Sequence, residues 1–570
     1  MKLREALEII HSDRSGAAQI QYLLGFSATP NPLQTFLQAF LLTRQSSLAV
    51  GVDTLPYGDL IGALEGRDPN GYAGAAIVVE WYDLDPRLGF RRLGGWARSA
   101  IPDIVATVQQ NLQRLRAAIQ RLAAAMPVAI SLPTLPLPPI SITAPPQAHE
   151  YEAKLWTEAW TFAGWCASRR NVRLLNPADL DRDSPTAARF DFRAELGQGS
   201  PYKLAHASAL AELLSRLLAP EPALKGLITD LDDTLWKGLL GEVGPAGVAF
   251  TLQGGAQIHG LYQQFLQSLA ERGVLLAIAT KNDPALVDQA LARPDLLVTK
   301  DSFFPVEAHW GPKSESVERI LNAWNVGPEA VAFIDDSPME AAEVQSRFPE
   351  LRCLRFTAND PSHLLQLFDT LRQWYGKSAI RAEDRLRVES VRNAASLDAS
   401  RDGFLATLQS RVTFHLSRDS GDDRAFELLN KTNQFNLNGR RLTLPDWARI
   451  LADPEAFLLT VEYTDKFGSL GKIAVIIGHS RGASATIEYW ALSCRAFSRR
   501  IEHATLAHLF DRLGVEAIAL DYAPTDRNGP VREFLAGLEI SPKEPVISLS
   551  AFEARCPHLQ FVPEDFPAHV

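Results

Sequence analysis

The sequence contains few cysteines, and those it has are scattered. The four cysteines, Cys166, Cys353, Cys494 and Cys556, form no CxxC pair. This argues against a disulfide framework or a zinc ribbon and favours a reducing compartment, so we expect a cytoplasmic protein. The sequence also has no tract of Lys and Arg, and its net charge is -10. Nucleic acids and anionic membranes are therefore not expected as partners.

Long apolar runs are also missing. No stretch of about 18 uncharged apolar residues occurs, so no membrane span is predicted. The opening MKLREALEIIHSDRSG carries charges inside its apolar run, unlike a signal peptide. The composition is 46% hydrophobic and 22% charged, which is ordinary for a globular protein. Because a chain of 570 residues is too long for a single core, about three to four domains are expected.

Three regions differ in their pattern of helix and strand signals. Residues 1–222 mix amphipathic helices, the longest at 102–125, with strand-like runs such as AAIVVEW and VAISL, which predicts an α/β domain. Residues 223–376 alternate buried strands with helices, the pattern of a doubly wound parallel sheet. Residues 377–570 open with a charged connector helix, at about 378–393, and continue with four strands and two helices. This last pattern predicts an α+β domain.

Two carboxylates follow the first buried strand of the middle region. In GLITDLDDT, Asp230 stands at the strand terminus and Asp232 comes two residues later. A carboxylate in this place can attack phosphorus and form an aspartyl phosphate, so Asp230 is predicted to be the nucleophile. Asp232 is predicted to protonate the leaving oxygen and later to activate water. The adjacent Asp233 is open to interpretation as a structural neighbour only.

Groups that suit a phosphoryl oxygen follow the second strand. Thr280, Lys281 and Asn282 close LLAIATKND, and Lys313 begins a predicted helix after the loop AHWGP. The threonine offers a hydroxyl, and a lysine at a helix start can neutralise the phosphoryl charge. These four residues are therefore predicted to bind phosphate.

The third strand end is acidic. AVAFIDDSP places Asp335 and Asp336 at the carboxyl end of its strand, where hard carboxylates are expected to hold Mg²⁺ beside the nucleophile. A lone DxDxT often does no more than cap a turn. Four such elements in this order, three of them at the ends of buried strands, are instead typical of a phosphotransfer site.

The set resembles the four motifs of the haloacid dehalogenase superfamily, matched by Asp230 with Asp232, Thr280, Lys313 and Asp335 with Asp336. The resemblance implies that Mg²⁺ is held by Asp230, by the backbone carbonyl of Asp232 and by the last two aspartates. About fifty residues separate Asp230 from Thr280, and about thirty separate Thr280 from Lys313, which leaves little room for an inserted cap domain. A capless site is expected, suited to a large substrate or covered by another domain.

The likeness is closer still to the FkbH-like proteins of polyketide assembly lines. It is carried by DLDDTLWKGLLGEVG, ATKND, FIDDSPME and the unusual string LLNKTNQFNLNGRR. It covers the chain from about Ala223 to its C-terminus. It implies an enzyme that takes a glyceryl unit from 1,3-bisphosphoglycerate, removes phosphate and loads the unit onto an acyl carrier protein with a phosphopantetheine arm. The family usually has Asn at Asp233, Ser at Thr280 and Asn at Ser337, and all three departures keep polarity.

The last region resembles the GNAT acyltransferase fold. The strand TIEYWALSC, the loop RAFSRR and the helix IEHATLAHLF are similar to the strand, loop and helix that cradle the phosphate end of pantetheine in that fold. The resemblance implies that Arg495, Arg499 and Arg500 add positive charge. The FkbH-like loop normally has glycines where Ser498 and Arg500 stand, which weakens the case for a close backbone approach here.

The same resemblance implies that Cys494, in LSCR, forms an acyl thioester. A following helix N-terminus and nearby arginines would favour its thiolate, whereas a small buried hydrophobe is the alternative. His503 is a candidate base, or else a residue that faces solvent or core. Asn433, Gln434 and Asn436 are predicted to bind the glyceryl or pantetheine group, or merely to build a turn.

The first region resembles the SGNH hydrolase domains at the front of many FkbH-like proteins, through GQGSPYKLAHASALAELLSRLLAP near its end. Where a GDS motif is expected, the chain has LLGFSATPNPLQ. We interpret this domain as a non-catalytic one that docks the carrier protein. Ser27 as an esterase nucleophile is the alternative.

Three functions compete at this level. The leading one is a bifunctional enzyme that makes glyceryl-carrier protein. The second is a stand-alone phosphatase for a small phosphate ester, with a vestigial C-terminal domain, and Cys494 and the string NKTNQFN disfavour it. The third is a scaffold that recruits carrier proteins, which the intact Asp230, Asp232, Lys313 and Asp335 disfavour.

Overall fold

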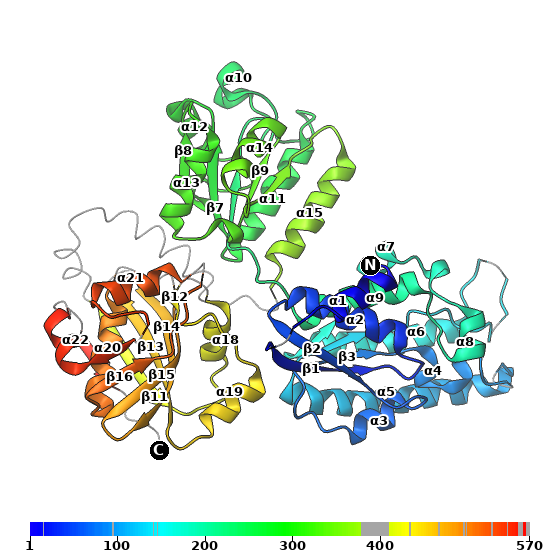
Figure 1. Ribbon diagram of the computed structural model, residues 1–570. Coiled ribbons are helices and arrows are strands. Elements are labelled where there is room, and N and C mark those ends of the chain that lie inside the picture. Colours follow the sequence, from blue (N-terminus) through cyan, green and yellow to red (C-terminus); the bar gives the residue numbers. More distant parts are fainter. Residues whose placement is uncertain are drawn as a thin grey trace. The chain divides into compact units, whose positions relative to one another are not determined.

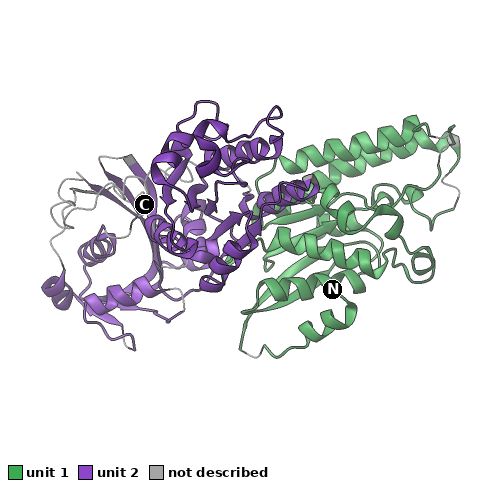
Figure 2. Ribbon diagram, turned by 90° about the horizontal axis from the view of Figure 1, so that it is seen from above, with its two compact units in different colours: residues 1–221, 443–446 green, residues 222–442, 447–570 purple. Residues whose placement is uncertain are grey.

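The structure is a computed structural model, and it describes residues 1–14, 16–93, 96–140, 142–144, 146–377, 410–432, 435–465, 468–493, 496, 499–525, 528–543, 545–556 and 562–565. The chain divides into two compact units, residues 1–221 with 443–446 and residues 222–442 with 447–570 (Figure 2). The connector helix expected at 378–393 lies outside the described residues. Within the described ranges, no helix is long and apolar enough to cross a membrane.

Unit 1 is built on a five-stranded parallel sheet. Its strand order is β2 (Leu48–Thr54), β1 (Ala18–Gly25), β3 (Gly74–Val78), β4 (Val128–Ser131) and β5 (Val172–Leu174). The longer helices around it are α1 (Leu3–Ile10), α2 (Asn31–Arg44), α3 (Leu60–Gly66), α5 (Ile101–Ala125), α6 (Glu150–Ala167) and α9 (Leu204–Leu218). The shorter ones are α4 (Trp81–Leu84), α7 (Pro177–Asp183) and α8 (Phe192–Gln198). The expected α/β architecture is confirmed.

Alternating side chains of the unit 1 sheet enter two different cores. Leu24 and its same-face neighbours pack against α1, α2 and α9, whereas Leu23 and Ile77 pack against α3, α5 and α6. Because successive strand residues point to opposite faces, a sheet covered by helices on both sides needs apolar residues at every position. β3, for example, is buried along its whole length.

The middle region also forms a five-stranded parallel sheet, which lies in unit 2. Its order is β10 (Arg352–Arg355), β9 (Val331–Asp335), β6 (Gly226–Thr229), β7 (Leu275–Thr280) and β8 (Phe303–Ala308). The helices are α10 (Leu240–Gly247), α11 (Gln257–Glu271), α12 (Pro284–Leu291), α13 (Lys313–Trp324), α14 (Pro338–Arg347) and α15 (Pro361–Tyr375). The predicted doubly wound sheet is confirmed, and β8 and β10 are two strands that the apolar runs did not predict.

Helices cover both faces of this second sheet. α11 and α15 lie side by side on one face, where Phe265 stacks on Phe368 with ring centroids 4.8 Å apart (Figure 1). α13 and α14 supply the core of the other face. Residues 222–377 are all described. Between Asp230 and Lys313 they form only α10, α11, α12, the short 3-10 helix Lys300–Ser302, β7, β8 and their connections. No further domain is inserted there, as the capless prediction expects.

The last region is a mixed sheet flanked by helices. Its strand order is β17 (Val546–Ser548), β16 (Ala517–Leu520), β15 (Ser484–Leu492), β14 (Gly468–Arg481), β13 (Ala456–Asp465), β11 (Arg411–Ser417) and β18 (Val562–Asp565), and β12 (Phe435–Asn436) pairs with β15. β15 and β16 run parallel, as do β11 and β18, and the other neighbours are antiparallel. This agrees with the expected α+β class. The GNAT and SGNH assignments stay predictions.

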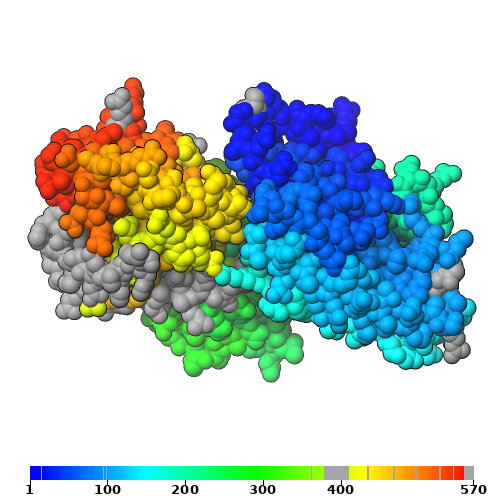
Figure 3. Space-filling model, turned by 90° about the horizontal axis from the view of Figure 1, so that it is seen from below, coloured from blue at the N-terminus to red at the C-terminus, as the bar shows by residue number. Residues whose placement is uncertain are grey.

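The two faces of the mixed sheet carry different helices. α18 (Asp423–Lys431) and α19 (Leu444–Leu451) pack on one face. α20 (Ile501–Leu513), α21 (Gly529–Gly537) and α22 (Leu549–Arg555) contribute to the main core with the other face. Figure 3 shows the chain in space-filling form, with unit 1 in blue to cyan and the mixed-sheet region in yellow to red.

A close approach in the second sheet depends on one glycine. A Cβ added at Gly226, the first residue of β6, would lie 2.3 Å from Cζ3 of Trp324. Trp324 is 1% exposed, and its indole N–H donates to the Phe304 carbonyl at 2.6 Å, so it has no room to move away. We expect Gly226→Ala to lower the free energy of unfolding of this domain by about 1–3 kcal/mol. The measurement is urea-dependent hydrogen exchange of the peptide that covers β6.

The control for this variant is Gly241→Ala, because a Cβ at Gly241 meets no atom within 4 Å. It should leave the exchange of β6 unchanged. Equal protection of β6 in the two variants would contradict the packing argument.

Candidate active site

A buried lysine joins two of the predicted carboxylates at the carboxyl edge of the second sheet. Lys313 Nζ, at the start of α13, lies 2.9 Å from Asp230 Oδ1 and 2.6 Å from Asp335 Oδ2. The lysine is 4% exposed, and the two aspartates are 5% and 0% exposed. The ends of β6 and β9 and the N-terminus of α13 therefore meet at one point, as expected for loops at this edge of a parallel sheet.

Three carboxylates gather around this point. Oxygens of Asp230, Asp335 and Asp336 all lie within 4.8 Å of one another. Burial raises the pKa of Asp230 to about 7, with Lys313 opposing the rise and Asp335 adding to it. Burial also raises the pKa of Asp336, and the charges of Asp335 and Asp233 raise it further. Burial alone would lower the pKa of Lys313, but the two aspartates outweigh it and the pKa is raised.

These residues suit a hard divalent cation. When all three carboxylates are ionised they face a single ammonium, and the group then carries surplus negative charge in a buried place. Carboxylate oxygens are the ligands that Mg²⁺ prefers, and a cation here would relieve the repulsion that raises the pKa of Asp336. Within the part of the chain that the structure describes, no other group of His, Cys, Asp and Glu side chains comes together in this way.

The side chain of Asp232 turns to other partners. Its Oδ1 accepts from the Trp236 indole at 3.0 Å, and its Oδ2 accepts from the Asn282 amide at 3.1 Å. The side chain is thus separate from the carboxylate group above. The family resemblance implies that the backbone carbonyl of Asp232, and not its side chain, would bind a metal.

The predicted phosphate-binding residues have different surroundings. Thr280 is 2% exposed, and its Oγ1 accepts from Asn282 Nδ2 at 2.9 Å. Lys313 lies in the centre of the site. Lys281, in contrast, donates to Glu340 Oε1 at 2.7 Å and is over one-third exposed. Of the two lysines, Lys313 is the one that contacts Asp230.

Asp233 and Thr234 shape the turn that follows β6. Asp233 adopts a left-handed φ of 50°, and its carboxylate accepts from the Gly238 backbone N–H at 2.9 Å. Thr234 Oγ1 accepts from the Asp336 backbone N–H at 3.1 Å. Asp and Asn tolerate this backbone conformation better than most residues. The geometry fits the interpretation of Asp233 as a structural neighbour.

The predicted acyl-binding residues divide into described and undescribed ones. Cys494, Arg495, Asn433 and Gln434 lie outside the described residues. The guanidinium of Arg499 lies over the Tyr463 ring, 5.3 Å from its centroid. Arg500 precedes α20 in a left-handed conformation. The His503 ring packs edge-on against Phe534, with centroids 5.1 Å apart.

Asn436 is engaged within the fold. It is 2% exposed, its amide donates to the Thr432 carbonyl at 3.1 Å, and its Oδ1 accepts from the Gly439 N–H at 2.8 Å. The next asparagine of the same string, Asn438, donates to the carbonyls of Glu488 and Asp521. This geometry fits the alternative in which the string builds a turn.

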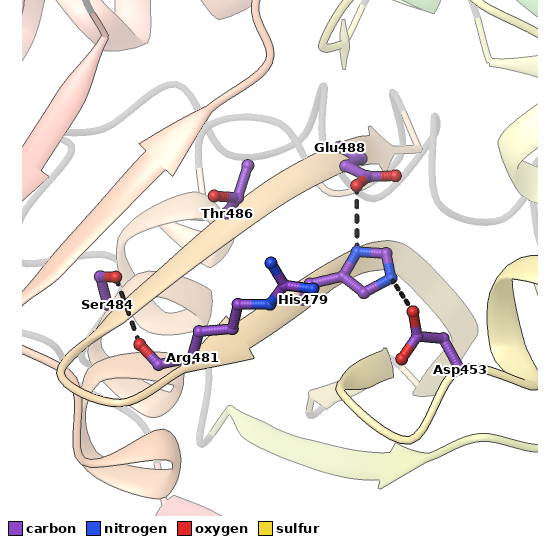
Figure 4. Close-up of a pocket in the computed structure, with 6 residues that line it drawn as sticks. All are labelled: Asp453, His479, Arg481, Ser484, Thr486 and Glu488. Atoms are coloured by element: carbon purple, nitrogen blue, oxygen red, sulfur yellow. Dashed lines mark hydrogen bonds and ion pairs between the residues drawn. The ribbon is translucent and has the colours of Figure 1, made fainter.

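A pocket of about 330 Å³ opens on the mixed sheet (Figure 4). His479 lies between two carboxylates in it, with Nδ1 3.0 Å from Glu488 Oε1 and Nε2 3.6 Å from Asp453 Oδ2. The remaining lining residues are Arg481, Ser484 and Thr486. Sequence reasoning missed this pocket, because its residues come from two strands and a loop and form no motif.

Ser27 follows β1 and is 5% exposed. Its hydroxyl donates to Asp83, whose pKa burial raises to about 7. The buried histidine of the same unit, His206, is engaged elsewhere: its ring nitrogens lie 3.1 Å from Thr134 Oγ1 and 3.0 Å from Ser184 Oγ. The described part of unit 1 therefore does not assemble a Ser–His pair on Ser27.

Comparison with known proteins identifies the second sheet. Residues 182–343 match the sequence family of haloacid dehalogenase-like hydrolases, and no curated protein matches the chain. The N-terminal part of the protein BF1531 from Bacteroides fragilis, which contains a phosphatase domain and was solved with Mg, is 16% identical with a TM-score of 0.51. The match covers 66% of this chain and 100% of that one.

A second solved structure is the haloacid dehalogenase family enzyme bt-2542 from Bacteroides thetaiotaomicron, in complex with magnesium and inorganic phosphate. It is 17% identical, with a TM-score of 0.18, and the match covers 25% of this chain and 98% of that one. From the family match and the BF1531 fold, the chain contains a haloacid dehalogenase-like hydrolase domain.

The carboxylate group predicts cation binding that depends on pH. The folded-state pKa of Asp230 lies above its unfolded value, so the proton stabilises the fold at low pH and this stabilisation is lost as pH rises through about 7. Because the proton competes with a cation for this carboxylate, a cation binds more tightly above that pH than below it. We expect Mg²⁺ to raise the melting temperature of this domain more at pH 8 than at pH 6, as measured by differential scanning fluorimetry.

Asp336→Asn should reduce this stabilisation, because it removes one of the three carboxylates without breaking the Lys313 pairs. Asp288→Asn is the matched control, since Asp288 is an exposed carboxylate of the same domain that pairs with Lys300. A Mg²⁺ effect that is the same at both pH values, or the same in both variants, would contradict the proposed ligands.

Proposed function

We propose that the haloacid dehalogenase-like domain of this chain is a Mg²⁺-dependent phosphohydrolase with Asp230 as its nucleophile. The observation that carries the proposal is the buried group in which Lys313 contacts both Asp230 and Asp335, 2.9 and 2.6 Å away. Such a group can receive a phosphoryl dianion, because a cation would join the lysine in balancing its charge. The BF1531 structure, which shares the fold and was solved with Mg, agrees with this choice.

The first half of the reaction forms a covalent intermediate. An oxygen of ionised Asp230 attacks phosphorus, and the bond from phosphorus to the leaving oxygen breaks. Asp232 gives its proton to that leaving oxygen. Thr280 and Lys313 hold the phosphoryl oxygens in place. When bound, Mg²⁺ supplies charge neutralisation between the carboxylates and the phosphoryl group.

The second half restores the enzyme. Asp232, now a carboxylate, takes a proton from water as the water oxygen attacks the aspartyl phosphate. The bond from phosphorus to Asp230 breaks, and phosphate leaves. The same side chain therefore serves as acid and then as base, which places strict demands on its position.

We further propose that the whole chain couples this phosphatase to acyl transfer. On this proposal, the C-terminal region takes the acyl group of 1,3-bisphosphoglycerate onto Cys494 and delivers a glyceryl unit to an acyl carrier protein. The support is the FkbH-like and GNAT-like sequence of residues 223–570, and the mixed sheet of the C-terminal region is compatible with it.

Chemistry orders the two activities. An acyl phosphate is already activated for attack by a thiol, and hydrolysis of that anhydride by Asp230 would waste the activation. Cys494 therefore takes the acyl group first, with release of phosphate, and Asp230 then hydrolyses the remaining phosphate monoester. Uncatalysed hydrolysis of such monoesters is extremely slow, which accounts for a complete aspartate site in the same chain.

The nucleophile assignment is tested by Asp230→Asn. The amide is nearly isosteric with the carboxylate but cannot attack phosphorus, so phosphate release should fall by roughly three orders of magnitude or more. The measurement is phosphate release from a simple monoester in the presence of Mg²⁺. Normal release by folded Asp230→Asn protein would refute the assignment.

Asp233→Asn is the matched control for that variant. Asp233 lies in the same turn, and its carboxylate accepts a hydrogen bond from the Gly238 N–H, which an asparagine oxygen can do as well. This variant should keep wild-type turnover.

The acyl-transfer proposal is tested by Cys494→Ala. Loading of a carrier protein with 1,3-bisphosphoglycerate should stop, while hydrolysis of a simple monoester at Asp230 should continue, because the two steps use different nucleophiles. Intact-mass analysis of the carrier and of the enzyme measures both species. Without carrier, wild-type enzyme should accumulate an adduct on Cys494 that hydroxylamine removes.

Cys556→Ala serves as the control, since Cys556 also belongs to the C-terminal region and is half-buried. It should load the carrier as the wild type does. Undiminished loading by Cys494→Ala would mean that the acyl group passes directly to the pantetheine thiol. Failure of the wild type to load any carrier would favour the stand-alone phosphatase.

A further inference from the structure

We propose that Trp236 and Asn282 are positioning residues that fix Asp232 for its two proton transfers. This inference rests on the proposed phosphohydrolase function, and it adds how the Asp232 carboxylate is held in position for acid–base catalysis. Each of the two residues donates one N–H to a different oxygen of Asp232, at 3.0 and 3.1 Å. Neither residue is one of the three carboxylates at the cation site.

Trp236 is an immobile partner. It is 0% exposed and belongs to the hydrophobic core of the domain, and its backbone N–H donates to the Leu231 carbonyl at 3.2 Å. An indole N–H can donate but cannot accept. Trp236 therefore holds Oδ1 of Asp232 from the core side with a donor that is fixed in place and cannot accept a proton.

Asn282 connects Asp232 to the phosphate-binding hydroxyl. It is 3% exposed, and its Nδ2 lies 3.1 Å from Asp232 Oδ2 and 2.9 Å from Thr280 Oγ1. Oδ2 is thus the carboxylate oxygen on the side of Thr280, where the phosphoryl group binds. This geometry makes Oδ2 the oxygen that gives a proton to the leaving group and later takes one from water.

The two hydrogen bonds from Trp236 and Asn282, here called the clamp, hold a side chain that is otherwise not fixed by the fold. Asp232 lies beyond the end of β6 and is half-buried, so the strand itself does not fix its side chain. Proton transfer requires the Asp232 oxygen to lie within hydrogen-bond reach of the leaving-group or water oxygen. Small errors in the position of Asp232 therefore lower the rate of the step. With both oxygens engaged, the carboxylate cannot rotate about its last bond without breaking two hydrogen bonds.

A misplaced acid should matter more for poor leaving groups. The alcohol of an alkyl phosphate must be protonated as it leaves, whereas 4-nitrophenolate leaves readily without a proton. Loss of the clamp should therefore slow the first step with glycerol phosphate and spare it with 4-nitrophenyl phosphate. The second step uses Asp232 as a base with either substrate, so the aspartyl phosphate should accumulate when the good leaving group is used.

The experiment compares Trp236→Phe and Asn282→Ala with wild-type chain in Mg²⁺. For both variants we expect kcat with glycerol phosphate to fall at least about tenfold, with little change in KM. General acid–base catalysis accelerates a reaction by roughly 10²–10⁴-fold, and a misplaced Asp232 should lose part of that factor. With 4-nitrophenyl phosphate, a rapid burst of one nitrophenolate per enzyme should precede a slow steady state. Acid quenching should then reveal a phosphoenzyme that hydroxylamine cleaves.

Trp324→Phe is the matched control. Trp324 is another fully buried tryptophan of the same domain whose indole donates a hydrogen bond, but its acceptor is the Phe304 carbonyl, away from the site. It should lower stability as Trp236→Phe does, yet keep the wild-type rates of both steps with both substrates. If Trp236→Phe fails to fold, Asn282→Ala carries the same comparison.

The outcomes separate the two levels of the proposal. Equal losses with both substrates and no burst, in variants that resemble Trp324→Phe, would overturn the positioning role and leave the phosphohydrolase intact. A wild-type chain that hydrolyses neither ester would overturn both. A burst with the aryl ester, together with a first turnover that is slowed with the alkyl ester alone, supports the positioning role.

Discussion

The site is organised around the ammonium of Lys313. It is buried, and it contacts one carboxylate from the end of β6 and another from the end of β9. Burying a charge is costly unless it is paired, so these three groups are mutually dependent. Asp230, Asp335 and Lys313 must come together for the charge of any one of them to be tolerated in the interior. Lys313 alone does not balance the charge of Asp230, Asp335 and Asp336. A cation would balance the rest and could then also bind an anionic phosphoryl group.

The turn after β6 fits the same constraint. Thr234 accepts a hydrogen bond from the backbone of Asp336, which joins the loop of β6 to the loop of β9. Asp233 closes the turn through Gly238 in a left-handed conformation. Trp236 then enters the core and returns its indole N–H to Asp232. Three residues of this turn thus have separate roles: Asp233 closes the turn, Thr234 joins the two loops and Trp236 holds Asp232.

The sequence was sufficient to predict the central strands and a site at their carboxyl ends that includes Asp230, Lys313 and Asp335. It was not sufficient for everything around them. β6, β7 and β9 are buried on both faces and read as apolar runs. β8 and β10 lie at the sheet edges, are only partly buried and carry Glu307 and Arg352, so their signal is weak. The link from Asn282 to Asp232 joins loops fifty residues apart and leaves no local periodicity. Lys281 looked equivalent to Lys313 in sequence, and only the fold reveals that Glu340 holds it.

Unit 1 and the hydrolase domain use the same kind of sheet for different ends. In unit 1, the carboxylate of Glu80 follows β3 at 0% exposure and accepts hydrogen bonds from the backbone and hydroxyl of Thr134, from the Leu135 N–H and from the Tyr202 hydroxyl. Its charge is thus met by groups of the chain itself.

In the hydrolase domain, the carboxylates at the corresponding edge have a single lysine among them. Open parallel sheets bind ligands at this edge, but the architecture alone does not decide whether one is bound. The balance of charge decides whether a ligand is bound. A sheet edge whose polar groups satisfy one another is stable without a ligand. A sheet edge with excess carboxylates favours a cation, and the cation in turn attracts a phosphoryl group.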